Sequence, residues 1–403
     1  MRVRPRDRQH HEPERDEPGS AGRGDLRVRL LAEPDAAARR SWDALVDRTP
    51  GTDVTQLTAW PRVRALSGFA ARWVLAERDG ELVGGAQLLI RRLPVLGRVG
   101  YVPYGPVVPA GTADRPEVVR ALAGALAGPA ARGTRALFVQ PPEDGADVSV
   151  ELLALGFRPS EAGIAPVGSI RIDLTEDLDL IRGRFGRRLR SWTNRWESRG
   201  VRVRRGDEAD VPLLASLMEH SAAQQGHPAL PAGYVQVLYR ELAATGHAEL
   251  FVGEVDGTPV AADLVTRCGG MVRGRLTGFD RSGEAGRLSV PAAIRWEIIR
   301  WGHAEGLHWL DFGGLRPATL DALDAGGGPP PEGWLPVDQP KLTFGGTAFR
   351  YPQAMELLSP RPVRAGYDLV VRSPAGRQAL DRARSLLRDV RGPRTRSPRE
   401  VAT

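Results

Sequence analysis

The sequence predicts a mixed α/β (α+β) fold made of two similar modules, and an internal repeat is the main observation behind this prediction. Residues 74–90 (VLAERDGELVGGAQLLI) and 250–265 (LFVGEVDGTPVAADLV) each have the pattern strand, Asp-Gly turn, strand. Asp79-Gly80 of the first segment matches Asp256-Gly257 of the second. Further strand-like sequence follows both segments, so the two halves of the chain are expected to share one architecture.

A helix, a glycine and a short apolar strand come next in each half. In the first half these are Val118–Ala131, Gly133 and Ala136–Val139, and in the second half Ala292–Glu305, Gly306 and Trp309–Phe312. A glycine directly after a helix is a common stop signal, and the apolar run that follows is typical of a buried strand. The agreement in order and spacing supports two modules of one kind.

An arginine-rich helix is predicted over Glu176–Arg199, with Thr175 as its N-cap and Gly200 after its end. Apolar residues recur at steps of three and four, at Leu178, Ile181, Phe185, Leu189, Trp192 and Trp196. Between Arg182 and Arg205 there are ten arginines and a single acid, Glu197. This positive charge suits contacts with nucleic-acid phosphates, and a solvated helix face is the alternative.

Three segments are expected to be disordered tails or a loop. Residues 1–24 and 392–403 are charged and rich in proline or glycine, so both tails are expected to be disordered. Pro317–Pro340 contains GGG and PPP runs and is expected to form a long surface loop. Loops of this length inside a domain are usually functional or flexible.

Composition limits the class of protein. The chain has 403 residues, of which 41% are hydrophobic, and a formal net charge of +7. This charge favours polyanionic partners, including a peripheral contact with an anionic membrane surface. Cys268 is the single cysteine and the seven histidines are scattered, so neither an intrachain disulfide nor a metal site is expected. No secretory signal and no membrane-spanning run is recognisable, which favours a soluble, cytoplasmic protein.

Lys341 is the only lysine, since lysine and arginine total 56 and the other 55 are arginine. A chain that uses arginine almost everywhere keeps few lysines at indifferent surface positions. The position is therefore expected to require a compact ammonium on a flexible stem, which a guanidinium does not replace. Chance survival of one lysine in an ion pair at a strand end is the alternative.

Five short segments, in the same order along residues 54–360, resemble the FemABX aminoacyltransferases. They are QLTAWPRVR (Gln56–Arg64), YVPYGPV (Tyr101–Val107), the arginine-rich segment Phe185–Val203, DFGGL (Asp311–Leu315) and KLTFGG (Lys341–Gly346) with Tyr351 beyond it. The resemblance implies two tandem GNAT-like domains without the helical hairpin that some members insert. It places domain 1 at 26–165, completed by 349–391, and domain 2 at 166–348.

The resemblance also implies an activity, the transfer of an amino acid from aminoacyl-tRNA to an amine, normally in a peptidoglycan precursor stem peptide. This chemistry needs no cofactor and no metal, because the ester is already activated. Lys341 is the candidate catalytic residue, acting as a charge stabiliser that stays protonated. The candidate substrate-binding residues are Arg64, Tyr104, Tyr234, Asp311, Gly313 and Gly314. A cleft between the two domains is expected to be lined by Arg64, Tyr104, Tyr234 and Lys341. The candidate tRNA-binding residues are Arg184, Arg188, Arg195 and Arg199.

Three departures from the family pattern leave alternatives open. Arg64 stands where a lysine is usual, Gln140 where many members have an acid, and Leu230 where a basic residue is expected. The acceptor is therefore a peptidoglycan precursor or another amine, such as a specialised metabolite. An acyl-CoA-dependent GNAT enzyme is a further alternative, although its phosphate-binding loop would lie at Arg281–Gly286, where Glu284 replaces a glycine. The last alternative is a non-catalytic paralogue that binds RNA or the precursor.

Overall fold

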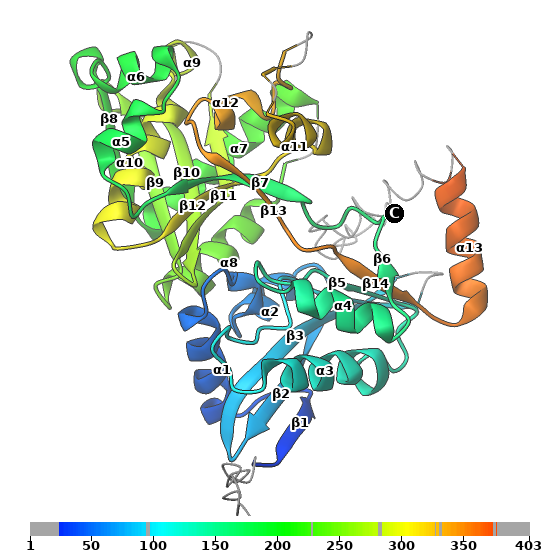
Figure 1. Cartoon of the computed structure of the whole chain (residues 1–403). Coiled ribbons are helices and arrows are strands. Elements are labelled where there is room, and N and C mark those ends of the chain that lie inside the picture. Colours follow the sequence, from blue (N-terminus) through cyan, green and yellow to red (C-terminus); the bar gives the residue numbers. More distant parts are fainter. Residues whose placement is uncertain are drawn as a thin grey trace, which may run out of the picture.

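The computed structural model describes residues 24–93, 97–226, 229–280, 284–326, 328–329, 333–373 and 376. The tails that were predicted to be disordered lie outside these residues, apart from Gly24. Within the described ranges the chain forms two seven-stranded sheets, and the first of them takes one strand from near the end of the described chain (Figure 1).

The first sheet has the strand order β1-β2-β3-β4-β5-β14-β6. Its strands are β1 (Leu26–Leu31), β2 (Phe69–Arg78), β3 (Glu81–Leu93), β4 (Gly97–Val102), β5 (Ala136–Val139), β6 (Arg158–Pro159) and β14 (Met355–Leu358). The helices of this half are α1 (Ala36–Arg48), α2 (Trp60–Ala65), α3 (Arg115–Ala125) and α4 (Ala146–Ala154). α3 packs on one face of the sheet, whereas α1 and α2 pack on β3 and β2.

The second sheet has the order β13-β7-β12-β11-β10-β9-β8. Its strands are β7 (Gly168–Asp173), β8 (Val201–Gly206), β9 (Ala248–Val255), β10 (Thr258–Cys268), β11 (Met271–Phe279), β12 (Trp309–Gly314) and β13 (Thr347–Arg350). The helices after the first module are α5 (Leu178–Gly183), α6 (Arg187–Thr193), α7 (Val211–Gln225), α8 (Ala232–Ala243), α9 (Glu284–Arg287), α10 (Val290–Ala304), α11 (Pro317–Asp324), α12 (Gln339–Leu342) and α13 (Arg361–Arg372).

The predicted repeat is confirmed by the turns and by the parallel strand pairs. Asp79 and Asp256 have φ of 52° and 49°, the left-handed conformation that a tight hairpin turn requires at its first central residue. In each half the strand after the hairpin pairs in parallel with the strand after the long helix, β4 with β5 and β11 with β12. Both halves thus follow one α/β plan.

The arginine-rich segment is not the single helix that its periodicity predicted. It forms α5, α6 and a 3₁₀ turn at Glu197–Arg199, and Asp177 rather than Thr175 caps α5. Gly183 and Gly186 fall at the break, where their low helix propensity favours a change of direction. The apolar stripe still packs inward, since Ile181, Phe185 and Leu189 belong to the core of the second sheet.

Two further segments differ from expectation. Pro317–Pro340 is not a continuous loop, because α11 occupies its first third and α12 begins at Gln339. Phe349 and Arg350, which were assigned to domain 1, pair with β7 in the second sheet. Only after them does the chain return to the first sheet, as β14. The domain boundaries otherwise remain a prediction.

The two halves share an apolar layer that lies between their sheets. α1 and α2 meet α7 and α8 there, and one buried cluster joins Trp42 and Trp60 of the first half to Leu238 and Leu250 of the second. Burial of this much apolar surface favours a fixed arrangement of the two modules. The polar residues described below lie along this junction and in the second sheet.

Candidate active site

The second sheet opens where β11 and β12 part. These strands pair in parallel only through Met271–Arg273 and Trp309–Asp311, and no ladder pair joins them beyond Arg273 and Asp311. An inner cavity of about 290 Å³ lies at the opening. It is lined by Asp263, Val265, Gly274, Arg275, Thr277, Arg295, Ile298, Leu310, Asp311, Phe312 and Lys341.

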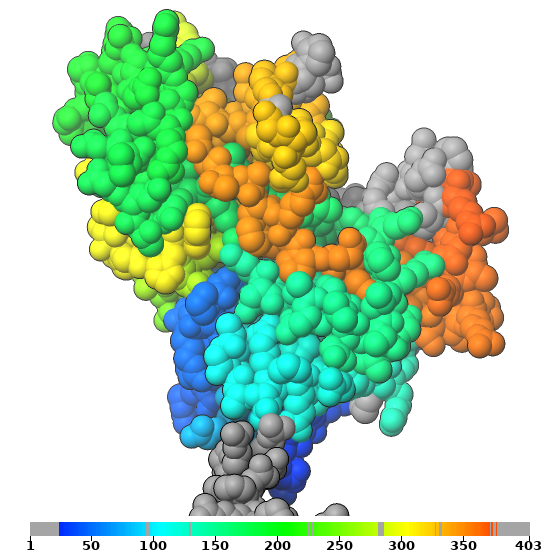
Figure 2. Space-filling view, viewed as in Figure 1, coloured from blue at the N-terminus to red at the C-terminus, as the bar shows by residue number. Residues whose placement is uncertain are grey.

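A larger cavity of about 810 Å³ adjoins it, since Thr277, Arg295 and Lys341 line both. Its walls come from α6, the start of α10 and the segment before Phe344. Figure 2 shows the segment with Lys341, in orange, seated against the green α5 and α6 segment. The Gly186 amide donates to the Thr343 carbonyl at 2.8 Å, which fixes this contact. The arginine-rich segment therefore forms one side of the cavity mouth.

Lys341 is half-buried on α12, between the two cavities. Its Nζ donates to the carbonyl of Gly314 at 2.6 Å and lies 3.5 Å from that of Gly313. Burial lowers the pKa of Lys341, while Asp338 and Asp311 oppose this effect. This burial has no signal in the sequence, because it comes from elements that are distant along the chain. Among the described residues, no carboxylate forms an ion pair with it.

Asp311 holds the backbone that Lys341 contacts. Its side chain is fully buried; Oδ1 accepts from the Gly313 amide at 2.7 Å and Oδ2 from the Tyr351 hydroxyl at 2.6 Å. Gly313 has φ of +81°, a conformation that a residue with a Cβ rarely adopts. The structure thus brings together Asp311, Gly313, Gly314 and Lys341. Asp311 orients the backbone at Gly313, next to the carbonyls that Lys341 contacts.

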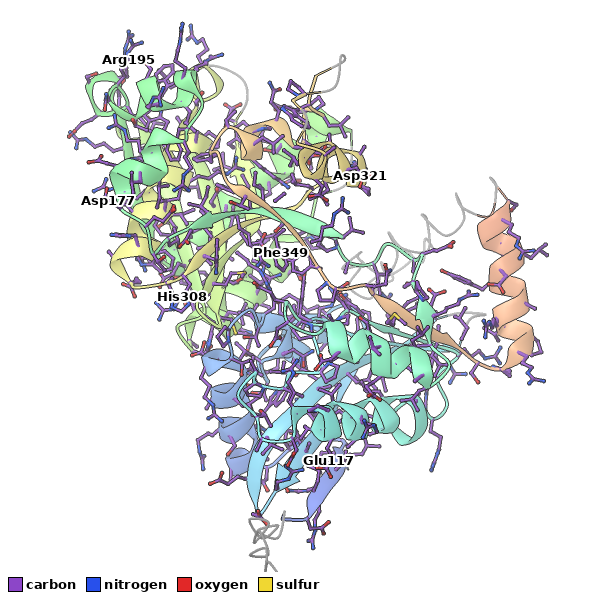
Figure 3. All side chains as sticks on the ribbon, viewed as in Figure 1. Glu117, Asp177, Arg195, His308, Asp321 and Phe349 are labelled. Atoms are coloured by element: carbon purple, nitrogen blue, oxygen red, sulfur yellow. The ribbon has the colours of Figure 1, made fainter. Side chains whose placement is uncertain are left out.

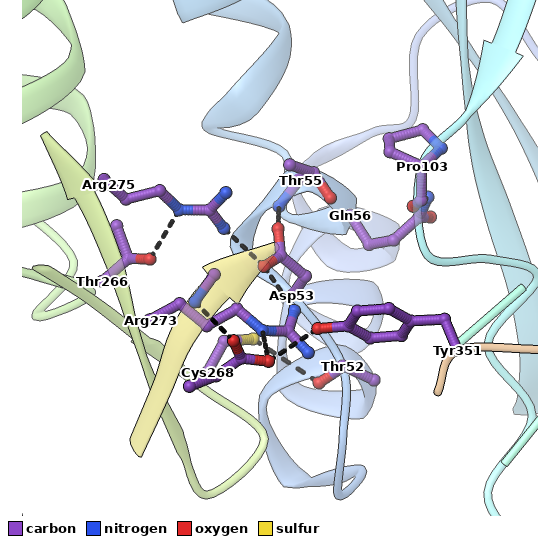
Figure 4. A network of polar contacts seen from close by, with 12 residues as sticks. Thr52, Asp53, Thr55, Gln56, Pro103, Thr266, Cys268, Arg273, Arg275 and Tyr351 are labelled. Atoms are coloured by element: carbon purple, nitrogen blue, oxygen red, sulfur yellow. Dashed lines mark hydrogen bonds and ion pairs between the residues drawn. The ribbon is translucent and has the colours of Figure 1, made fainter. Parts of the chain in front are cut away.

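A buried ionic network crosses the junction of the two modules (Figure 4). Asp53, just before the 3₁₀ turn Val54–Gln56, accepts from Arg273 Nη1 at 2.5 Å and also from Arg275, both on β11. Burial alone would raise the pKa of Asp53, but Arg275 and Arg273 outweigh it and hold that pKa well below its usual range. A second link joins Arg171 on β7 to Glu143 at 2.7 Å.

Tyr104 lies beside this network. Its φ is 47°, the Arg273 guanidinium lies 4.8 Å from its ring centroid, and the Tyr351 ring meets it edge-on at 5.5 Å. Burial, reinforced by Tyr351, raises its pKa well above 10.0, so the phenol stays neutral. Gln140, where the family often has an acid, is buried and donates to the carbonyls of Pro141 and Pro352. It therefore offers no base.

Arg64 and Tyr234 lie apart from the cavities. Arg64 on α2 stacks over Phe69, with 4.7 Å between its guanidinium and the ring centroid. Tyr234 on α8 is only 7% exposed and belongs to the apolar cluster between the sheets. Of the four residues expected to line one cleft, Lys341 alone lines the two cavities described here. The substrate-binding roles of Arg64, Tyr104 and Tyr234 stay predictions.

Three of the candidate tRNA-binding arginines are exposed and lack an acidic partner. Among the described residues, Arg188, Arg195 and Arg199 form no ion pair, whereas Arg184 pairs with Glu176. Arg188 lines the outer cavity. Figure 3 shows Arg195 at the far tip of the second module. The unpaired charge thus runs outward from the cavity mouth.

Sequence reasoning missed Asp263 and Arg295, which line the inner cavity. Asp263 lies in the middle of β10, within the apolar run AADLV, and a charge inside such a run was the available signal. Arg295 on α10 lies with its Nε 3.9 Å from Asp263 Oδ2. Nothing in the sequence showed that the two would meet.

Two features are absent from the described residues. They contain no group of three or more His, Cys, Asp or Glu side chains placed to hold a metal ion. Over the same part of the chain, no helix is both long and apolar enough to cross a membrane.

Comparison with known proteins agrees with this architecture. A family model described as an acetyltransferase (GNAT) domain matches residues 183–321. The crystal structure of FemX superposes with a TM-score of 0.71 at 19% identity, over 84% of this chain and 99% of that one. The structure of L-PGS from Bacillus licheniformis gives a TM-score of 0.52 at 13% identity, over 90% and 99% of the two chains. The protein therefore consists of two GNAT-like domains in tandem.

One relative found by sequence similarity is an aminoacyltransferase by name. Over 225 residues the chain is 30% identical to the lipid II:glycine glycyltransferase of Staphylococcus aureus (strain COL). The match covers 53% of each protein, so the chain spans about half the length of the curated relatives it matches. This likeness, the fold and the matching GNAT model agree with the resemblance to the FemABX aminoacyltransferases.

Proposed function

We propose that this protein is an aminoacyltransferase that moves an amino acid from aminoacyl-tRNA to an amine of a peptidoglycan precursor. The observation that carries the proposal is Lys341, the only lysine, at the point where β11 and β12 part. Parted parallel strands leave backbone groups and side chains facing an open space, where an ester can lie close to an attacking amine.

The reaction forms a C–N bond and breaks the C–O bond of the ester. The neutral acceptor amine attacks the carbonyl carbon, negative charge collects on the carbonyl oxygen, and the ribose hydroxyl then leaves with a proton from the amine. Lys341 Nζ has three N–H groups, and the Gly314 and Gly313 carbonyls are positioned for two of them. The third is free to stabilise charge that develops in the cavity.

The donor is supported by the charge at the cavity mouth. Arg188, Arg195 and Arg199 provide exposed guanidinium groups for tRNA phosphates. Arg295 and Lys341 place two more cations inside the cavities, where the terminal nucleotide would enter. The acceptor is supported by the likeness to a protein named as a lipid II glycyltransferase. A cytoplasmic protein in peripheral contact with an anionic membrane would meet such an acceptor.

The test is a transfer assay with a panel of charged tRNAs and with precursor and small-molecule amines as acceptors. We expect product with at least one charged tRNA and a precursor acceptor, and loss of product after ribonuclease treatment. Product that survives ribonuclease and requires an acyl-CoA would overturn the proposed donor. Product only with small-molecule amines would overturn the proposed acceptor.

A further inference from the structure

Asp263 is a buried residue whose carboxylate has one oxygen without a hydrogen-bond donor among the described residues. It lies in the middle of β10 with 4% of its surface exposed, and it lines the inner cavity. Its Oδ1 has no hydrogen-bond partner among the described residues. Its Oδ2 has Arg295 Nε at 3.9 Å, which is too long for a hydrogen bond.

The neighbouring buried carboxylates differ from Asp263 in their partners. Asp311 accepts from Gly313, Tyr351 and Arg171, and Asp53 accepts from Arg273, Arg275 and the Thr55 amide. A buried carboxylate oxygen that accepts no hydrogen bond is costly to the fold. Burial raises the pKa of Asp263, while the charge of Arg295 and a hydrogen bond with the Thr277 side chain lower it. A fold that keeps such a group beside a cavity has a place for a donor from outside the chain.

The other residues that line the cavity indicate what kind of ligand carries this hydrogen-bond donor. Val265, Ile298, Leu310 and Phe312 give the cavity an apolar wall, and its volume of about 290 Å³ lies near the lower end for ligand pockets. Lys341 lies where this cavity meets the outer one. A ligand in the inner cavity would thus meet the Asp263 carboxylate, which can accept from a cationic group, and the Lys341 ammonium, which would lie near the reacting carbonyl.

We propose that Asp263 binds the α-ammonium group of the transferred amino acid. The ester carbonyl then faces Lys341, and the side chain of the amino acid lies against the apolar wall. Asp263 is in this way a specificity-determining residue, since an acetyl or fatty acyl group has no ammonium to offer it. The inference rests on the proposed function in one respect, namely that the donor is an aminoacyl ester.

Binding of stable donor analogues tests the inference without turnover. The analogues are 3′-aminoacylamino-3′-deoxyadenosine, its N-acetyl form, and the α-hydroxy form in which OH replaces NH₃⁺. We expect the wild-type protein to prefer the free ammonium over both other forms by about ten-fold or more, as for a hydrogen bond between charged groups. Asp263→Asn should abolish this preference and leave binding of the N-acetyl form unchanged.

Asp321→Asn is the matched control, because Asp321 is exposed on α11 and pairs only with Arg350 in the described part of the chain. It should keep the wild-type preference. Thermal unfolding checks that Asp263→Asn still folds, and the comparison of three analogues on the wild-type protein needs no variant at all. An equal affinity of the wild-type protein for the three analogues overturns the inference.

The outcomes separate this inference from the proposed function. If charged tRNA supports transfer but Asp263→Asn keeps the preference for the ammonium, Asp263 is not its binding partner and only the inference fails. If the wild-type protein binds none of the analogues and uses no charged tRNA, the proposed function fails and the inference fails with it.

Discussion

The parallel strand pairs of the two modules differ in what lies beyond them. In the first module, backbone hydrogen bonds continue past β4 and β5, since the Gln140 amide donates to Val102 and the Gly105 amide to Gln140. The Gln56 side chain then closes the end of the pair by donating to the Pro103 carbonyl at 2.5 Å. In the second module, the equivalent strands separate after Arg273 and Asp311 and leave a cavity. The same arrangement of strands is thus closed at its end in the first module and opens into a cavity in the second.

The difference shows where polar residues serve the fold and where they serve chemistry. At the junction, the Asp53 carboxylate and the Arg273 and Arg275 guanidinium groups face one another and hold the modules together. In the cavity, Asp263 and Lys341 keep part of their hydrogen-bonding capacity unused. The following variants test this contrast, from the largest expected effect to the smallest.

Asp53→Ala should destabilise the protein by about 3–5 kcal/mol, because the buried Arg273 keeps only a long contact with Asp311 and the half-buried Arg275 loses its acid. Urea unfolding at neutral pH measures the change. Asp25→Ala, at an exposed pair with Arg27, should change stability by less than about 1 kcal/mol. A similar small effect for Asp53→Ala would contradict the view that the junction is held by this network.

The same residue sets an expected pH dependence. The folded-state pKa of Asp53 is depressed, so its contribution to stability is complete above the unfolded pKa, about 3.9, and is lost as pH falls below it. Unfolding measured between about pH 5 and pH 2.5 should show a steeper loss in the wild-type protein than in Asp53→Asn. Parallel curves for the two proteins would assign the acid sensitivity to other groups.

Lys341→Ala should lower kcat by about 10²–10³-fold, because the charge stabiliser at the parted strands is removed. Lys341→Arg should also lose most activity, since the planar fork does not reproduce the contacts with Gly314 and Gly313. Both are measured in the transfer assay, with thermal unfolding as the check on folding. Full activity of Lys341→Arg would show that any cation suffices there.

Replacing Arg188, Arg195 and Arg199 together by alanine should weaken tRNA binding and reduce its salt dependence by up to about one unit of log–log slope per lost phosphate contact. Filter binding over a salt series measures the slope. Arg204→Ala, at a residue that pairs with Asp210 and Glu254, is the control and should leave the slope nearly unchanged. An unchanged slope in the triple variant would exclude this surface from binding.

Tyr234→Phe should have the smallest effect, because the ring of Tyr234 lies in the apolar cluster between the sheets. Loss of one hydroxyl from such a position should change stability by about 1 kcal/mol or less and leave kcat nearly unaltered. Steady-state kinetics with the precursor acceptor measure this. A large rise in KM would restore the predicted role of Tyr234 in acceptor binding.

The sequence predicted the parts of the fold that depend on local chemistry. Asp-Gly turns, apolar strands and the helix before Gly306 have short-range signals and occur close to where they were expected, whereas the helix predicted over Val118–Ala131 changes to a π-helical turn at Leu126–Ala130. The return of Met355–Leu358 to the first sheet has no short-range signal and was expected only from the family resemblance, since it depends on pairing with residues more than two hundred positions earlier. Gly183 and Gly186 disfavour a continuous helix between α5 and α6. The prediction of a single helix gave more weight to the apolar periodicity than to these two glycines.

The candidate site was predictable only where an unusual residue marked it. Lys341 stood out because of the arginine bias, and Asp311 because of the DFGG segment. The desolvation of Lys341 and the unused oxygen of Asp263 arise from neighbours on other strands and helices. Such properties depend on tertiary packing, which residue patterns do not encode directly.

The late arrival of β14 has a consequence for how the protein is made. Residues 24–159 supply all the other strands of the first sheet, but Met355–Leu358 inserts between β5 and β6 only after the second module has been synthesised. Until then, β5 presents an open edge on the ribosome, and such edges favour pairing with other chains. The first module thus emerges before the second and is completed after it, so a nascent chain truncated before residue 355 should be more prone to aggregate than the complete two-module chain.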